Sequence, residues 1–156
     1  MAKKARFRND IRIENRKARF DYEILETVEA GVALTGCEVK SIREGKASLS
    51  EVYAMPRGSE LLLRGMHISP YNEGRGEMPD PYRDRKLLLH RKQMDKMIGG
   101  QSTQGYSIVP LRLYFNEKGI AKIEIALCRG KKVHDKREAI KKRDNEREVR
   151  REFKTR

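Results

Sequence analysis

Positive charge is concentrated at the two ends of this 156-residue chain, and the segment between them is electrically neutral. Residues 1–20 contain eight basic and two acidic residues, and residues 129–156 contain thirteen basic and six acidic residues. The net charge of +13 therefore lies outside residues 21–128, which hold fifteen charges of each sign. We predict a basic N-terminal arm (1–19), a compact domain (20–128) and a basic tail (129–156).

The tail contains few apolar residues. Residues 129–156 include only five, which are Val133, Ala139, Ile140, Val149 and Phe153. Burying so few cannot offset the chain entropy lost on ordering, which is about 1–2 kcal/mol per residue. We predict that the tail is unfolded when free and that its helix-forming residues become helical on a partner. The alternative is a solvating basic tail without a dedicated site.

Alternating apolar and polar residues predict strands in the neutral segment. Residues 109–115 and 123–127 alternate on either side of the loop 116–119, which is typical of a β-hairpin. Pro110 cannot donate a ladder hydrogen bond, so this strand lies at an edge or carries a bulge there. A second hairpin joins 52–55 to 61–63.

Further elements complete a mainly β domain. An earlier strand begins near Phe20 and turns near Ala30-Gly31. Thr35 and Glu38 have capping-box spacing and predict a short helix, and residues 90–98 predict another, ended by Gly99-Gly100 and filled with core methionines. Five or six strands in about 108 residues favour a closed antiparallel barrel or a sandwich with flanking short helices.

The chain lacks the signatures of an enzyme or a membrane protein. Its three histidines have no metal-ligand spacing, and no GxSxG, HExxH or phosphate-loop motif occurs. We therefore expect no catalytic activity, metal or cofactor. No apolar run approaches the ~20 residues of a membrane span, and no signal-peptide pattern is present. Cys37 and Cys128 do not form a metal-binding or disulfide pattern, and their free thiols suit a reducing cytoplasm.

With these classes set aside, the basic ends predict a protein that binds a polyanion. The absence of a helix-turn-helix, zinc-finger or basic-zipper pattern favours RNA over duplex DNA. The aromatic residues Phe20, Tyr71, Tyr82 and His134 could stack on unpaired bases. The long proline- and glycine-containing segment 70–85 has the length of a functional loop. About six phosphate contacts from the tail would give a log–log salt slope of about −4 to −5.

Four sequence runs, taken together, identify a known family. They are 29–31 (EAG), 35–47 (TGCEVKSIREGKA), 80–90 (DPYRDRKLLLH) and 130–137 (GKKVHDKR). In this order they resemble small protein B, the SsrA-binding protein family of bacteria. The resemblance runs from about Asn15 to the tail.

The resemblance implies a fold and a function. The family has an oligonucleotide-binding (OB)-type barrel with flanking helices, which agrees with the strand pattern above. Its members bind the transfer-RNA-like part of transfer-messenger RNA (tmRNA) and deliver the aminoacylated RNA to stalled ribosomes in trans-translation. The barrel takes the place of an anticodon arm, while the tail tests whether the mRNA channel is empty. We therefore expect tmRNA and the ribosome as partners, a cytoplasmic location and a monomeric protein.

The resemblance also implies residues that hold the RNA. Asn15 would hydrogen-bond to an RNA edge, and Leu88 would pack on a sugar or base, with core packing as its alternative. Because like charges repel, Glu29 would order a loop or contact a base and not a phosphate. The residues expected to meet phosphates are Lys40, Arg43, Lys46, Arg83, Arg85 and Lys86. Any of these could instead be an ordinary surface charge.

The tail would contact the decoding centre and the mRNA channel. His134 resembles a residue that stacks on a ribosomal RNA base, and Asp135 could also cap a helix. The accompanying residues are Lys131, Lys132, Lys136 and Arg137.

Two positions depart from the family pattern. Phe20 stands where histidine is frequent, which keeps stacking but loses a hydrogen bond, and Cys37 replaces a more usual Thr or Trp.

Two other functions remain open from the sequence. A ribosomal protein that binds ribosomal RNA permanently would also carry basic arms on a small barrel. A metal-dependent nuclease could use Asp80 and Asp84 to hold Mg²⁺, although both lie among arginines and ion pairing is the simpler interpretation.

Overall fold

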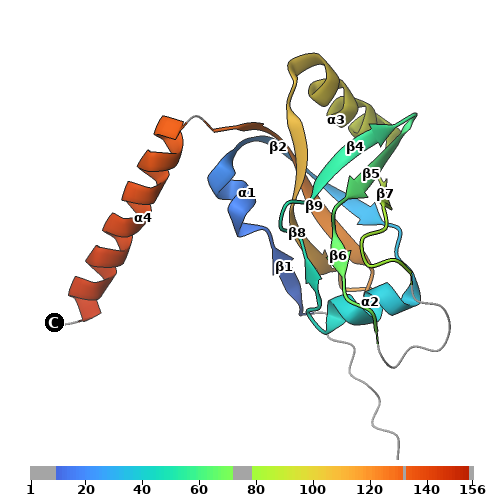
Figure 1. Cartoon of the computed structure of the whole chain (residues 1–156), viewed down its shortest axis with the longest axis horizontal. Helices are drawn as coiled ribbons and strands as arrows, with labels where there is room; N and C mark the ends of the chain where they lie inside the picture. The colour runs from blue at the N-terminus through green and yellow to red at the C-terminus, as the bar shows by residue number, and fades with distance from the viewer. Residues whose placement is uncertain (1–9, 72–78, 132, 155–156) are drawn as a thin grey trace, which may run out of the picture.

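The computed structural model describes residues 10–71, 79–131 and 133–154, and it describes only the backbone of 103–104 and 133–136. Strands and helices fill most of these ranges (Figure 1). In chain order they are β1 (Arg12–Glu14), α1 (Arg16–Asp21), β2 (Tyr22–Val32), α2 (Gly36–Arg43), β3 (Ala47–Ser48), β4 (Tyr53–Arg57), β5 (Glu60–Arg64), β6 (His67–Ile68), β7 (Arg85–Leu88), α3 (Arg91–Gln104), β8 (Ser107–Phe115), β9 (Ala121–Gly130) and α4 (Val133–Lys154).

Six antiparallel strands close into a ring. Their order is β8-β4-β5-β7-β2-β9, and β9 pairs again with β8. The predicted OB-fold-like antiparallel barrel is therefore confirmed, and the sandwich is excluded. β1 adds a further pairing on β8, and β3 pairs with β6 in a separate ladder. The sheet thus includes residues 12–14, which the sequence assigned to the N-terminal arm.

Strand alternation fills the barrel with apolar side chains. Leu113, Ile123, Ala30 and Leu87 come from four different strands, and each is at most 1% exposed. α2 and α3 lie at opposite ends of the barrel (Figure 1), and both insert side chains into the same core. The methionines of α3 are core residues, as predicted.

α2 begins at the predicted capping box. The Glu38 amide donates to Thr35 Oγ1 at 3.3 Å, and the Thr35 amide donates to Glu38 Oε1 at 3.0 Å. α3, in contrast, does not end at Gly99-Gly100. It continues to Gln104 and ends where Gly105 adopts a left-handed conformation with φ 68°. A Cβ on Gly100 would lie 2.5 Å from Leu127 Cδ2, so this glycine permits close packing instead of stopping the helix.

β2 differs from the strand predicted in that region. Phe20 belongs to α1, and β2 runs through Ala30-Gly31 without the predicted turn. Gly31 is paired on both sides, with Leu88 of β7 and Lys122 of β9. The glycine therefore serves a close strand approach: a Cβ there would lie 3.2 Å from Leu88 Cβ.

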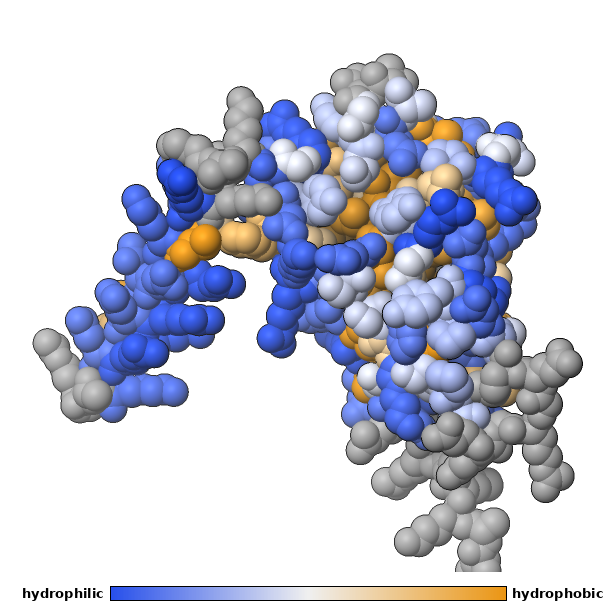
Figure 2. Space-filling view, in the orientation of Figure 1, coloured by the Kyte–Doolittle hydropathy of each residue, from blue (hydrophilic) through white to orange (hydrophobic). Residues whose placement is uncertain are grey.

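α4 is a 22-residue helix that points away from the barrel (Figure 1). Residues 141–154 are exposed on all sides, and Figure 2 shows a hydrophilic surface along most of the helix. It meets the barrel near α1, where the Arg143 guanidinium lies 6.0 Å from the centre of the Phe20 ring. So exposed a helix gains little from burial. That the tail is unfolded when free stays a prediction.

Candidate nucleic-acid interface

The outer face of β8, β9 and β2 has a covered half and an open half. On the covered half, Ala18 of α1 packs on Val109, Leu111, Ala126 and Cys128. On the open half, outward-pointing side chains form a mixed polar and apolar surface, which we call the outer patch. Its members are Glu29, Leu88, Arg112, Tyr114, Lys122 and Glu124.

A bulge in β8 exposes the outer patch. The register of β8 against β9 shifts between Pro110 and Arg112, as predicted for a proline inside a strand. Because side chains alternate along a strand, inserting one residue exchanges the two faces. Beyond the bulge Leu113 points into the core, while Arg112 and Tyr114 point outward.

Strand pairing arranges the patch in two parallel rows. One row crosses β8, β9 and β2 through Arg112, Glu124 and Glu29. The second row crosses four strands, from Tyr114 to Lys122, Gly31 and Leu88. Residues far apart in sequence, such as Glu29 and Leu88, thereby become near neighbours.

Polar contacts connect the two rows. The Tyr114 hydroxyl donates to Glu29 Oε2, and the Arg112 guanidinium lies 5.1 Å from the centre of the Tyr114 ring. Arg112 also donates to Glu124 Oε2 from Nε, at 3.0 Å. Burial, followed by the hydrogen bond to Glu29, raises the pKa of Tyr114 to about 12. The phenol therefore remains a hydrogen-bond donor at neutral pH.

A shallow pocket lies where Gly31 has no side chain. It is lined by Glu29, Gly31, Leu88, Leu89, His90, Gln93 and Lys122. Leu88 is 51% exposed there, so core packing, the alternative considered for it, is wrong. The pocket offers a carboxylate acceptor, an ammonium group and an apolar side chain within one site. These groups suit an unpaired nucleotide, because they can bind a base edge, a phosphate and a sugar or base face respectively.

Sequence reasoning placed Glu29 and Leu88 in a predicted RNA site but missed their neighbours in the pocket and the outer patch. Tyr114 and Lys122 belong to predicted strands, and their alternation could have shown that they share a face with each other. Joining that face to Glu29 required the register of β2 against β9, which local sequence does not reveal.

Asn15 has a different place from the one predicted. Its side chain is buried at 7% exposure. Its Oδ1 accepts from the Ala18 amide at 3.2 Å and caps α1, while its Nδ2 donates to the Pro110 carbonyl at 2.9 Å. Both ends of the amide are thus engaged within the protein. Asn15 thereby fastens α1 to the bulged segment of β8, and its predicted hydrogen bond to an RNA edge stays a prediction.

Arg83 and Arg85 are likewise engaged within the protein. They surround the carboxylate of Glu38 in a group that we call the inner cluster. Arg85 is 0% exposed and donates to Glu38 Oε2 from Nε at 2.7 Å and to the Met66 carbonyl at 2.7 Å. Arg83 donates to Glu38 and to the Ala33 carbonyl. Buried Arg85 cannot reach a phosphate in this structure, and the guanidinium of Arg83 already serves Glu38.

Electrostatics favour the charged form of the inner cluster. Burial alone would raise the pKa of Glu38, but hydrogen bonds from Arg83, the Thr35 amide and Arg85 outweigh burial and lower it. The carboxylate therefore stays ionised between its two guanidinium partners. Since Glu38 lies on α2 and the arginines lie on or before β7, the cluster ties one end of the barrel to its wall.

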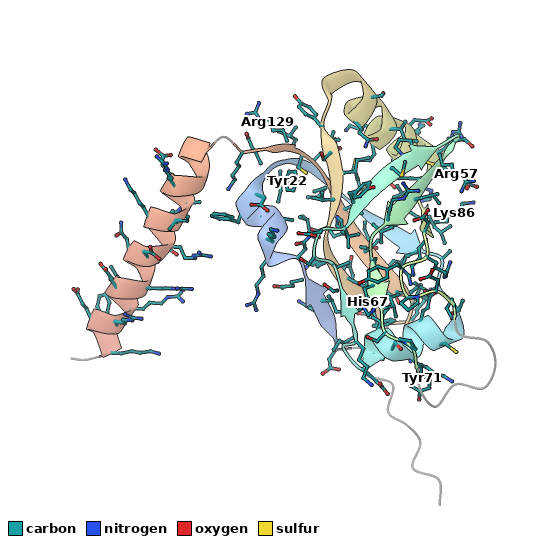
Figure 3. All side chains as sticks on the ribbon, viewed as in Figure 1. Tyr22, Arg57, His67, Tyr71, Lys86 and Arg129 are labelled. Atoms are coloured by element: carbon teal, nitrogen blue, oxygen red, sulfur yellow. The ribbon has the colours of Figure 1, made fainter. Side chains whose placement is uncertain are left out.

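The other basic residues predicted to meet phosphates lie on the surface, with one exception. Lys40, Lys46 and Lys86 are exposed; Figure 3 shows Lys86 on the β7 side of the barrel. The Lys86 ammonium pairs with Glu60 at 2.8 Å. Exposed pairs of this kind are weak and can exchange for a phosphate. Arg43 is the exception, because it donates to the Gly119 carbonyl at 3.1 Å and stacks 4.9 Å from the Phe115 ring centre.

The predicted tail contacts are only partly described. Lys131 is tied to the end of α1, where its amide donates to the Asp21 carbonyl at 2.9 Å and its Nζ to the Arg19 carbonyl at 3.2 Å. Arg137 is exposed. The side chains that fall outside the description are those of Lys132, His134, Asp135 and Lys136.

The acidic residues of the nuclease alternative have protein partners. Asp84 pairs with Arg64 at 3.4 Å, and Asp80 accepts from the Tyr82 amide at 2.8 Å. Across the described ranges there is no group of three or more His, Cys, Asp or Glu side chains placed to hold a metal ion. Likewise, no helix in those ranges is long and apolar enough to cross a membrane.

A small closed barrel with an exposed pocket of mixed polarity and a long basic helix is typical of nucleic-acid-binding proteins. The family model described as SmpB protein matches residues 12–155. An SsrA-binding protein of Methylobacterium sp. (strain 4-46) is 51% identical over 95% of this chain and 94% of its own length. An SsrA-binding protein of Rhodopseudomonas palustris (strain TIE-1) is 56% identical over 86% of each chain. The chain belongs to the SmpB family.

A solved structure agrees with this assignment. It is described as "tmRNA-SmpB: a journey to the center of the bacterial ribosome". The matching chain is 47% identical to this one, with a TM-score of 0.67, over 83% of this chain and 94% of that one.

Proposed function

We propose that this chain binds tmRNA at its transfer-RNA-like domain and delivers the aminoacylated RNA to stalled ribosomes in trans-translation. The observation that carries the proposal is the 47% identical chain in the tmRNA-SmpB ribosome structure. The names of the curated relatives support the same RNA. The protein acts as a cytoplasmic adaptor without catalysing a reaction.

The work is divided between the barrel and the tail. The outer patch, with the exposed lysines around it, holds the RNA. The tail, including His134 and Arg137, contacts the decoding centre and tests whether the mRNA channel is empty. Its excess of positive charge supports a partner rich in phosphate.

Recovery of bound RNA tests the first half of this proposal. The full-length protein is captured from a bacterial lysate at moderate salt, and the RNA that accompanies it is sequenced. We expect one dominant species that has a transfer-RNA-like end. A profile of ribosomal RNA, with about one copy of the protein per ribosome, would contradict the adaptor and favour a ribosomal protein.

Truncation tests the division of labour, and the structure decides where to cut. Arg129 and Gly130 pair with β2, and the Lys131 amide is bonded to Asp21, so the chain should end after Lys131. We expect this variant to bind tmRNA with nearly unchanged affinity and to lose ribosome rescue. Ile140→Pro is the matched control: it keeps the length and charge of the tail but disrupts α4. Loss of RNA binding in the truncated chain would contradict the division.

A further inference from the structure

Glu29 lies in the C-terminal half of β2 with its side chain on the exposed side of the sheet. A glutamate in this position has three side-chain torsions to order before it can make a directed contact. In the structure one carboxylate oxygen, Oε2, accepts the hydroxyl hydrogen of Tyr114. Tyr114 comes from β8, two strands away, so the contact bridges across β9.

Tyr114 is itself fixed from its other side. The Arg112 guanidinium lies over its ring at 5.1 Å from the centre, and Arg112 is held in turn by Glu124 through Nη2 at 2.9 Å. These side chains rest on paired strands beyond the β8 bulge. The hydroxyl therefore occupies a position set by the sheet and not by a flexible loop.

We propose that Tyr114 is a positioning residue for RNA binding, whose hydroxyl holds the Glu29 carboxylate at the edge of the pocket beside Leu88. The inference rests on the proposed function, in which Glu29 contacts the RNA. With Oε2 occupied, Oε1 remains to accept a hydrogen bond. Because an ionised carboxylate only accepts, its partner in the RNA is a base N–H or a ribose hydroxyl, and not a phosphate.

Preordering explains why a residue that does not touch the RNA affects affinity. Binding loses conformational entropy for each flexible side chain that becomes fixed in the complex. A side chain that its own protein already holds loses less. The donor is present whenever the protein works, since the pKa of Tyr114 is raised to about 12.

A double-mutant cycle with the full-length chain tests the proposal, using the transfer-RNA-like domain of tmRNA as the probe. We expect Tyr114→Phe to weaken binding about three- to tenfold, which corresponds to one hydrogen bond. We expect Glu29→Ala to weaken it more. In the Glu29→Ala background, Tyr114→Phe should change affinity by less than about twofold, because nothing is left for the hydroxyl to position. Equal losses in both backgrounds would overturn the proposal.

Two further measurements distinguish positioning from a structural role. Tyr53→Phe is the matched control, since the Tyr53 hydroxyl on β4 interacts with Arg64 and not with Glu29. The affinity of the Tyr53→Phe variant for the RNA probe should match that of the unmodified chain. Without RNA, the Tyr114 ring signal in NMR should titrate at lower pH in Glu29→Ala than in the unmodified chain, because the carboxylate raises the pKa of the phenol. An unchanged titration would overturn the contact itself.

The proposed function and this inference fail in different ways. If the unmodified chain does not bind the tmRNA probe, the proposed function fails. If that chain binds and Tyr114→Phe binds equally well, the function stands and the positioning role is wrong.

Discussion

The inner cluster and the outer patch are each organised around one glutamate, yet burial gives the two carboxylates opposite uses. Glu38 is 3% exposed; its Oε1 accepts from Arg83 and its Oε2 from Arg85. Glu29 is exposed, and it has one neutral partner, the Tyr114 hydroxyl. A buried carboxylate that lost its partners would be costly, whereas an exposed one can exchange water for a ligand. The same residue type therefore stabilises the fold in one place and is available for recognition in the other.

Glu38→Gln should have the largest effect on stability. It leaves the guanidinium of Arg85 buried without a charge partner, and breaking a buried pair in this way costs about 3–5 kcal/mol. Urea unfolding followed by circular dichroism measures the loss. Glu60→Gln is the matched control, because the exposed Glu60–Lys86 pair is worth about 0–1 kcal/mol. A loss as small as that of the control would show that the inner cluster contributes little.

The pH dependence of stability should separate the two regions. The pKa of Glu38 is lowered by folding, so its contribution is present above the unfolded value of 4.5 and is lost as pH falls through the folded value. The pKa of Tyr114 is raised from 10.0 to about 12, so its contribution is present below 10.0 and is lost as pH rises toward 12. The urea unfolding midpoint should therefore fall less steeply on the acid side in Glu38→Gln than in the unmodified chain. It should fall less steeply on the alkaline side in Tyr114→Phe. The opposite assignment would contradict this picture.

Local sequence predicted the elements that local interactions determine. The hairpin of β8 and β9, the capping box at Thr35 and the irregularity at Pro110 each depend on residues close together in the chain. The inner cluster does not, since Arg85 and Glu38 are 47 positions apart. Without the fold, Arg85 is indistinguishable from a basic surface residue in an arginine-containing segment.

The residues predicted to contact RNA followed the same division. The resemblance to a family pointed to Glu29 and Leu88, and the structure brings them to one pocket. The structural role of Asn15 was missed because its partner, the Pro110 carbonyl, lies 95 positions away. Tyr114 was overlooked because its contact depends on a bulge and on two strand registers at once.

Two glycines extend the comparison to packing. At Gly100 an added Cβ would meet Leu127 Cδ2 at 2.5 Å in the core, so Gly100→Ala should cost about 1–3 kcal/mol of stability. At Gly31 it would meet Leu88 Cβ at 3.2 Å. The Cβ of Leu88 cannot rotate away, so strands β2 and β7 must separate by a few tenths of an ångström, and Gly31→Ala should cost about 1 kcal/mol.

The RNA affinities of these two variants should show the reverse order. Gly31→Ala fills the pocket and displaces Leu88, while Gly100→Ala leaves the outer patch unchanged. Thermal unfolding and a filter-binding titration with the tRNA-like domain of tmRNA measure both quantities. Full RNA affinity in Gly31→Ala would show that the pocket is not part of the interface.

The smallest effect is expected at Lys86, the immediate neighbour of buried Arg85. Lys86 points outward from β7 and is 46% exposed in its pair with Glu60. Lys86→Ala should change stability by less than about 1 kcal/mol. If its ammonium meets a phosphate, the slope of log affinity against log salt should fall by about one unit. Lys96→Ala is the control, because Lys96 lies on α3 in a comparable exposed pair with Glu26. Equal slopes in the Lys86→Ala variant and the unmodified chain would make Lys86 an ordinary surface charge outside the RNA interface.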